Sequence, residues 1–140
     1  MIVRSGSAQY SGLGKEGKGH VSTQSGVLDH QPYGFNTRFE DGKGTNPEEL
    51  IAAAHAACFS MALSAGLAKA GTPPDELATS ATVTFQPGEG ITKIALTVEG
   101  SVPGLDASGF AEAAQTAKEN CPVSKALASV PEITLEARLR

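Results

Sequence analysis

The chain has 140 residues, a mass of 14.3 kDa and a formal net charge of −4, which fits one ordinary domain. No basic stretch stands out from the acidic background, so nucleic-acid binding by phosphate neutralisation is disfavoured. The first six residues lack the apolar segment of a secretory signal peptide, and two cysteines are too few for a disulfide scaffold. We therefore expect a single cytoplasmic domain, residues 1–140, with free thiols or a working redox pair.

The amino-terminal third is predicted to be extended. Residues 1–11 and 19–24 form two strands joined by a glycine-rich turn, and the apolar stretch 33–39 is predicted to be a third strand. The turn contains Gly-x-Gly-x-x-Gly at 12–17. A dinucleotide site needs a helix directly after this motif, whereas the segment that follows is extended, so we interpret it as a hairpin turn.

A long helix is predicted to begin at Asn46 and to run to Ala70. Asn46 is a good N-cap and Pro47 suits the first helical position, while Gly71 is a typical end signal. Both Thr45 with Glu48 and Asn46 with Glu49 have capping-box spacing, and the sequence leaves open which pair forms it.

Residues 50–68 of this helix carry no charged side chain and reach the length of a membrane span. Eight of them are alanine, polar residues are scattered among them, and aromatic anchors are missing. We therefore predict no membrane segment, but a helix buried on nearly all sides in a soluble protein. A helix of about 24 residues is roughly 36 Å long, which a second copy of the chain would cover more easily.

The remainder alternates strands and helices. Residues 79–86 and 91–99 are rich in β-branched residues and predict a hairpin around the turn 87–90. Asp106 is predicted to cap a helix ending near Glu119, Cys121-Pro122 to open a helical turn through Leu127, and 133–139 to form the last strand. The predicted fold class is α+β.

The two cysteines are the main candidates for chemistry. Two thiols on different apolar helices are the minimum equipment for attack and resolution in a thiol redox reaction. His55 lies one turn before Cys58 and could favour its thiolate, and Cys121 precedes Pro122 at a helix start. The three histidines lack metal-ligand spacing, so no metal is expected.

Arg38 and Glu48 are candidate supporting groups. Arg38 lies within the main aromatic cluster, Tyr33, Phe35 and Phe39, which suits a polar reacting head on an apolar substrate. Glu48 is ten residues before Cys58, about 15 Å along a straight helix. The two cannot touch within one chain, so Arg38 must bridge the gap or Glu48 must come from a partner subunit.

Three segments together resemble the osmotically inducible protein C (OsmC) family. They are Gln-Pro-Tyr-Gly-Phe-Asn-Thr-Arg-Phe-Glu at 31–40, Gly-Thr-Asn-Pro-Glu-Glu-Leu-Ile at 44–51 with the helix through Cys58, and Cys-Pro-Val-Ser at 121–124. The resemblance covers essentially the whole chain. It implies antiparallel sheets around two long central helices in an intertwined homodimer.

The resemblance also implies a thiol-dependent peroxidase for organic hydroperoxides in stress defence, with hydrogen peroxide a weaker substrate. Cys58 matches the attacking cysteine and Cys121 the one that closes the disulfide, while Arg38 and Glu48 match the charged pair of the family site. An external thiol, with lipoyl-type dithiols favoured, would restore the thiols without a bound cofactor. We expect Tyr33, Phe35 and Phe39 to line the substrate site.

Two other functions remain open from the residues themselves. One is hydrolysis or acyl transfer with Cys58 as nucleophile and His55 as base, which lacks a recognisable third member. The other is a non-catalytic dimeric stress protein that binds an apolar ligand in the pocket around residues 33–39.

Overall fold

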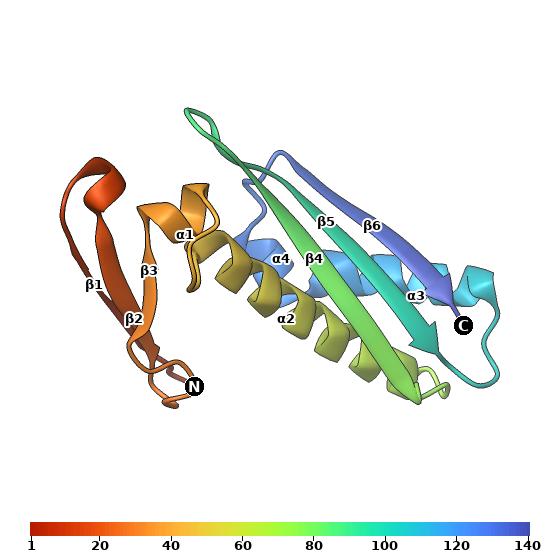
Figure 1. Ribbon diagram of the computed structural model, residues 1–140. Coiled ribbons are helices and arrows are strands. Elements are labelled where there is room, and N and C mark those ends of the chain that lie inside the picture. The colour runs from red at the N-terminus through yellow and green to blue at the C-terminus, as the bar shows by residue number, and fades with distance from the viewer. The chain divides into compact units, whose positions relative to one another are not determined.

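The computed structural model describes all 140 residues, which form two compact units, residues 1–50 and 51–140. The first unit contains β1 (Gly6–Ser11), a short 3₁₀ helix η1 (Gly14–Glu16), β2 (Lys18–Thr23), β3 (Gln31–Gly34) and α1 (Phe35–Phe39). Helix α2 (Pro47–Lys69) begins within the last residues of the first unit and continues into the second. The second unit adds β4 (Glu76–Gln86), β5 (Gly90–Ser101), α3 (Ala107–Asn120), α4 (Pro122–Ala126) and β6 (Glu132–Leu139) (Figure 1).

The first unit is an antiparallel sheet in the order β1-β2-β3. The Gly-x-Gly-x-x-Gly turn leads through η1 into strand β2, so its interpretation as a hairpin turn is confirmed. The predicted strand over 33–39 is wrong beyond Gly34, where α1 begins. The Thr37 hydroxyl hydrogen-bonds the amide and the carbonyl of Gly34 at 2.8 and 3.1 Å, which turns the chain from strand to helix.

The second unit is a three-stranded sheet in the order β4-β5-β6. β4 and β5 form the predicted antiparallel hairpin, and α3 is the crossover that lets β6 pair parallel to β5. The central strand β5 buries the side chains of Ile94, Leu96 and Val98 by strand alternation. Leu96 and Val98 pack with Phe59 from α2 and Phe110 from α3 in one core. The α+β class is confirmed.

Helix boundaries follow the predicted caps. The Asp106 carboxylate accepts the Gly109 amide at 2.7 Å at the start of α3. Helix α2 ends at Lys69, and Gly71 adopts the left-handed φ of +92° that closes such ends.

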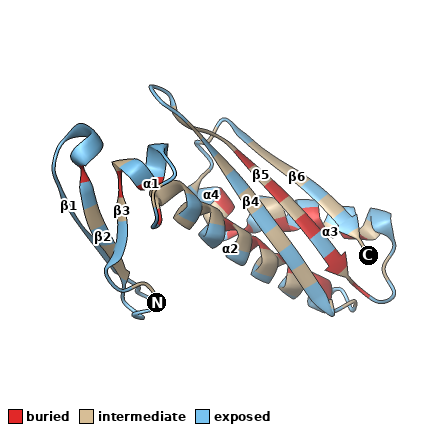
Figure 2. Cartoon of the chain, viewed as in Figure 1, coloured by how far each residue is buried: buried red, intermediate tan, exposed pale blue.

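Burial of α2 differs from the prediction. Its buried residues are spaced four apart, which is one stripe of the helix: His55, Phe59, Leu63 and Leu67. Met61 lies off that stripe with 73% of its surface exposed. Figure 2 shows the remaining faces of α2 as exposed or intermediate. The prediction of all-round burial is therefore wrong for the single chain, because α3 and the sheet cover one stripe of α2 only. By length and composition α2 is the one helix that could span a membrane.

Candidate functional site: an arginine–glutamate pair and two adjacent thiols

Arg38 and Glu48 form a two-pronged ion pair in the first unit. Arg38 comes from α1 and Glu48 from the first turn of α2; Nε donates to Oε1 and Nη2 to Oε2, each at 2.8 Å. This geometry fixes the plane of the guanidinium as well as its charge. The hydrogen bond to Glu48 raises the pKa of Arg38, burial opposes that rise, and the Glu48 charge adds to it. Arg38 is thus held as an oriented cation with a third of its side chain exposed.

Glu49, next to Glu48, has a different task. Its amide donates to the Asn46 side-chain oxygen at 2.8 Å, and its carboxylate accepts the Thr45 hydroxyl at 2.8 Å. Asn46 and Glu49 are therefore the capping pair of α2, one of the two possibilities that the sequence leaves open. This arrangement leaves the Glu48 carboxylate to Arg38.

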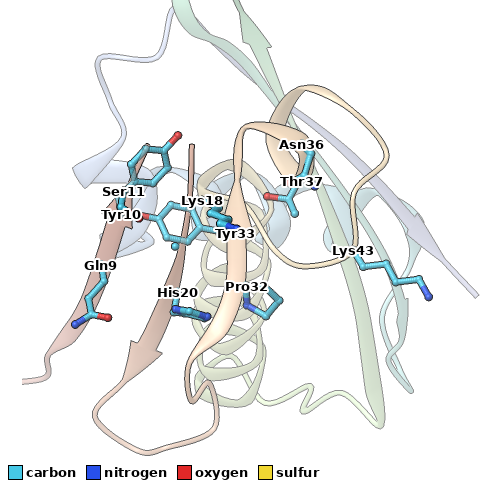
Figure 3. A pocket seen from close by; sticks show the side chains of 11 residues that line it. Gln9, Tyr10, Ser11, Lys18, His20, Pro32, Tyr33, Asn36, Thr37 and Lys43 are labelled. Carbon is cyan, nitrogen blue, oxygen red and sulfur yellow. The ribbon is translucent and has the colours of Figure 1, made fainter. Parts of the chain in front are cut away.

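The three aromatic residues expected at the substrate site are divided between two places in the first unit. The Phe35 and Phe39 rings lie 4.9 Å apart, and the Arg38 guanidinium carbon lies 5.5 Å from the Phe39 ring centre. Tyr33 instead packs on Tyr10 at 5.6 Å and lines a cavity of about 790 Å³ (Figure 3). The cavity is lined by neither phenylalanine.

The two cysteines lie together in the second unit as free thiols. Cys58 is half-buried on α2, and Cys121 is fully buried at the junction of α3 and α4. Burial raises the pKa of Cys58. The Val123 amide opposes that rise, but hydrogen bonding and charge repulsion from the neighbouring Cys121 sulfur reinforce it.

Cys121 behaves in the opposite way. Burial raises its pKa, but hydrogen bonds outweigh this effect, so that the net shift of the pKa is downward. These hydrogen bonds come from the Ser124 amide, the Cys58 thiol, the Ser124 hydroxyl and the Val123 amide. The neighbouring sulfur therefore raises the pKa of Cys58 and lowers that of Cys121, so the two thiols titrate as a pair.

His55 serves neither as a base for Cys58 nor as a support for its thiolate in this structure. Its Nε2 lies 2.7 Å from the Ser124 hydroxyl, its Nδ1 has no hydrogen-bond partner, and burial lowers its pKa. The Cys–His hydrolase hypothesis therefore lacks the contact it needs. Ser124 is a site residue that the sequence reasoning missed. The signal available was its position one helical turn after Cys121.

No group of three or more His, Cys, Asp or Glu side chains could hold a metal ion. The first unit therefore holds a cation paired with a carboxylate, and the second unit holds two neighbouring thiols. Two neighbouring free thiols on an α+β scaffold can form a reversible disulfide, which is the chemistry of a thiol-redox protein.

Comparison with known proteins gives the family. The OsmC-like protein family model matches residues 40–136, more than half of the chain. Peroxiredoxin OsmC of Escherichia coli (strain K12) is 57% identical over 99% of this chain and 98% of its own length. The chain belongs to the OsmC-like family, and α2 is accordingly a helix of a soluble protein.

More distant relatives agree in fold. Organic hydroperoxide resistance protein OhrB of Bacillus subtilis (strain 168) is 33% identical over 86% of this chain and 89% of its own length. The crystal structure of an organic hydroperoxide resistance protein OsmC from Legionella pneumophila superposes with a TM-score of 0.69 at 25% identity, covering 99% of both chains.

Proposed function

We propose that this chain is a thiol-dependent peroxidase that reduces organic hydroperoxides in stress defence, with Cys58 as the attacking residue and Cys121 as the resolving residue. The contact between the two thiols in the second unit carries the proposal. The relatives named peroxiredoxin and organic hydroperoxide resistance protein support the same class of reaction.

The reaction has three balanced steps. The Cys58 thiolate attacks the terminal peroxide oxygen, the O–O bond breaks, and the alkoxide leaves as an alcohol after taking a proton, so that Cys58 becomes a sulfenic acid. The Cys121 thiolate then attacks the Cys58 sulfur, and the departing hydroxide takes a proton to become water as the S–S bond forms. An external dithiol, for which we propose a lipoyl-type compound, reduces the disulfide with no bound cofactor.

Arg38 supplies what the thiol pair lacks in this proposal. Burial and the neighbouring sulfur both raise the pKa of Cys58, and no charged side chain of the second unit lowers it. A guanidinium at the thiol stabilises the Cys58 thiolate and the charge that develops on the departing oxygen. Glu48 orients that guanidinium by its two-pronged contact.

Exposed apolar surface supports the proposed substrate class and the proposed assembly. Phe35 and Phe39 beside Arg38, together with Tyr33, offer apolar contact to the organic tail of a hydroperoxide, which hydrogen peroxide cannot use. We propose a homodimer, since a second copy is the natural cover for the apolar faces of α2 that include Met61. We further propose that the protein acts in the cytoplasm, where reduced thiols persist.

A stoichiometric titration tests the reaction. One equivalent of an organic hydroperoxide added to the reduced protein should consume two thiols, and peptide mapping should find a Cys58–Cys121 disulfide. Cys121→Ser should still consume one equivalent and stop at a Cys58 sulfenic acid that a trapping reagent captures. Cys58→Ser should consume none. Two thiols that survive in the wild-type protein would contradict the proposal and favour a non-catalytic ligand-binding protein.

A further inference from the structure

A buried histidine–serine pair lies beside the resolving cysteine. His55 on α2 is 0% exposed and Ser124 on α4 is 8% exposed, and Nε2 lies 2.7 Å from Oγ. Ser124 follows Cys121 by one helical turn, and its hydroxyl is within hydrogen-bonding reach of the Cys121 sulfur as well as of the imidazole. The reaction steps described above give this pair no task.

The second ring nitrogen of His55 decides the tautomer. Nδ1 is buried with no hydrogen-bond partner, and burial lowers the pKa of His55, so the ring is neutral and carries one proton. With the proton on Nδ1, a buried N–H donor would be orphaned; with the proton on Nε2, only a lone pair is. A buried donor without a partner is the more costly arrangement. His55 therefore carries its proton on Nε2 and donates it to Ser124 Oγ.

The tautomer in turn sets the direction of the serine proton. A hydroxyl has one proton, and because Oγ already accepts from His55, that proton is free to point at the Cys121 sulfur. No charged side chain acts on Cys121: the groups that shift its pKa are Cys58 from α2 and the amides and hydroxyl of Val123 and Ser124 from α4. The hydroxyl is thus one of few groups able to stabilise a thiolate there.

We propose that Ser124, held by His55, is a positioning residue for disulfide closure: its hydroxyl donates to the Cys121 sulfur and keeps it a thiolate aimed at oxidised Cys58. For the closure step the inference rests on the proposed function. The effect on Cys121 itself does not, since it exists without any peroxide.

Loss of the hydroxyl has two opposed effects on closure. Fewer Cys121 sulfurs are ionised at a given pH, which slows attack on the Cys58 sulfenic acid. Each thiolate that forms is more basic and therefore more nucleophilic, with a Brønsted coefficient of about 0.4–0.5. Ser124→Ala should therefore close the disulfide about threefold more slowly at the acid end of the pH profile and about threefold faster at the alkaline end. The two profiles cross, whereas a packing defect slows closure at every pH.

The first experiment needs no peroxide. In Cys58→Ser protein, Cys121 is the only thiol, and its ionisation is followed by thiolate absorbance against pH. Adding Ser124→Ala should move the curve to higher pH, while Ser124→Thr, which keeps a hydroxyl, should leave it near its starting position. His55→Gln, which keeps a donor near the Nε2 position, should shift it less than His55→Leu. Ser60→Ala is the matched control, because Ser60 hydrogen-bonds Thr79 at 2.6 Å and serves neither thiol.

The second experiment follows closure after rapid oxidation by one equivalent of hydroperoxide, with the sulfenic acid trapped at intervals. Crossing pH profiles for the wild type and Ser124→Ala support the proposal, and parallel profiles overturn it. An unchanged thiol titration in Ser124→Ala overturns it independently. If Cys121→Ser protein forms no Cys58 sulfenic acid under the same oxidation, the peroxidase proposal fails, and the titration of Cys121 still decides the role of Ser124.

Discussion

Residues 1–50 and residues 51–140 hold different kinds of reactive group. The first unit presents a charged group at its surface: Arg38 has one-third of its side chain exposed, donates two hydrogen bonds to Glu48 and lies over the Phe39 ring. The second unit holds Cys121 in the same core as Phe110 and Val98, with the half-buried Cys58 packed against that core, and no charged side chain shifts the pKa of either thiol.

This difference shows what each unit lacks. Two neighbouring thiols can form a disulfide, but burial and the neighbouring sulfur raise the pKa of Cys58, which opposes its ionisation. An oriented guanidinium can stabilise a thiolate or a departing oxygen, but it has no nucleophile of its own. We infer that activity requires the Arg38 guanidinium as well as the two thiols.

The largest predicted effect is a loss of stability, and it should be much greater for a core residue of the second unit than for a residue of the first. Phe59→Ala empties a fully buried position in the second unit and should lower the free energy of unfolding by about 3–5 kcal/mol. Phe39→Ala removes a ring in the first unit that is 45% exposed and should cost less than about 1 kcal/mol. Urea unfolding of both variants measures this contrast. Equal losses would contradict the difference in packing.

Arg38→Ala should come next, as a loss of activity with the fold retained. Removal of a preorganised cation or donor costs about a hundredfold or more in turnover, and steady-state peroxidase assays with an organic hydroperoxide would measure it. Arg138→Ala is the matched control, since Arg138 pairs with Glu136 on the surface of β6. If both arginine variants kept wild-type turnover, the charged pair of the first unit would have no part in the reaction.

Glu48→Ala and Glu49→Ala separate orientation of Arg38 from capping of α2. Both remove an acid from the first turn of the helix, so the loss of the dipole contribution is common to the two. Glu48→Ala should lower kcat/KM about tenfold by freeing the guanidinium. Glu49→Ala should leave kcat/KM unchanged and cost about 1 kcal/mol of stability, because the cap with Asn46 and Thr45 is lost. The reverse pattern would exchange the roles of the two glutamates.

The smallest effect concerns His55 and pH. Burial lowers the pKa of His55 below its ordinary value of 6.5. Just below that pH the unfolded chain therefore binds a proton at His55 more readily than the folded chain does. Stability should therefore fall as pH drops below about 6.5, by at most about 1.4 kcal/mol per pH unit from this group. His55→Gln should make the dependence shallower, and the exposed His30→Gln should not. Identical slopes in thermal unfolding at several pH values would contradict a neutral, buried His55.

Much of the fold is readable from the sequence because its signals are local. Asp106 and Gly71 mark helix ends through hydrogen bonding and backbone conformation that need only a few neighbours. The segment 33–39 is misread because its apolar residues suit a strand or a helix, and a contact between Thr37 and Gly34 decides the matter.

The site divides in the same way. The sequence identifies Arg38, Glu48 and the two cysteines as candidates. The structure explains why Glu48 and not Glu49 pairs with the arginine, because Asn46 and Thr45 hydrogen-bond Glu49. The position of Ser124 one turn after Cys121 is too common a pattern to select it, and its partner His55 lies 69 residues away in the chain. Contacts between distant elements have no local signature.

We propose that Cys58 becomes reactive only with the help of Arg38. The most direct test measures the rate of Cys58 alkylation against pH in Cys121→Ser protein, with Arg38 present and with Arg38→Ala. We predict that the alkylation curve shifts to higher pH when Arg38 is removed, and that Glu48→Ala gives a smaller shift in the same direction. Superimposable curves for all three proteins would contradict the claim.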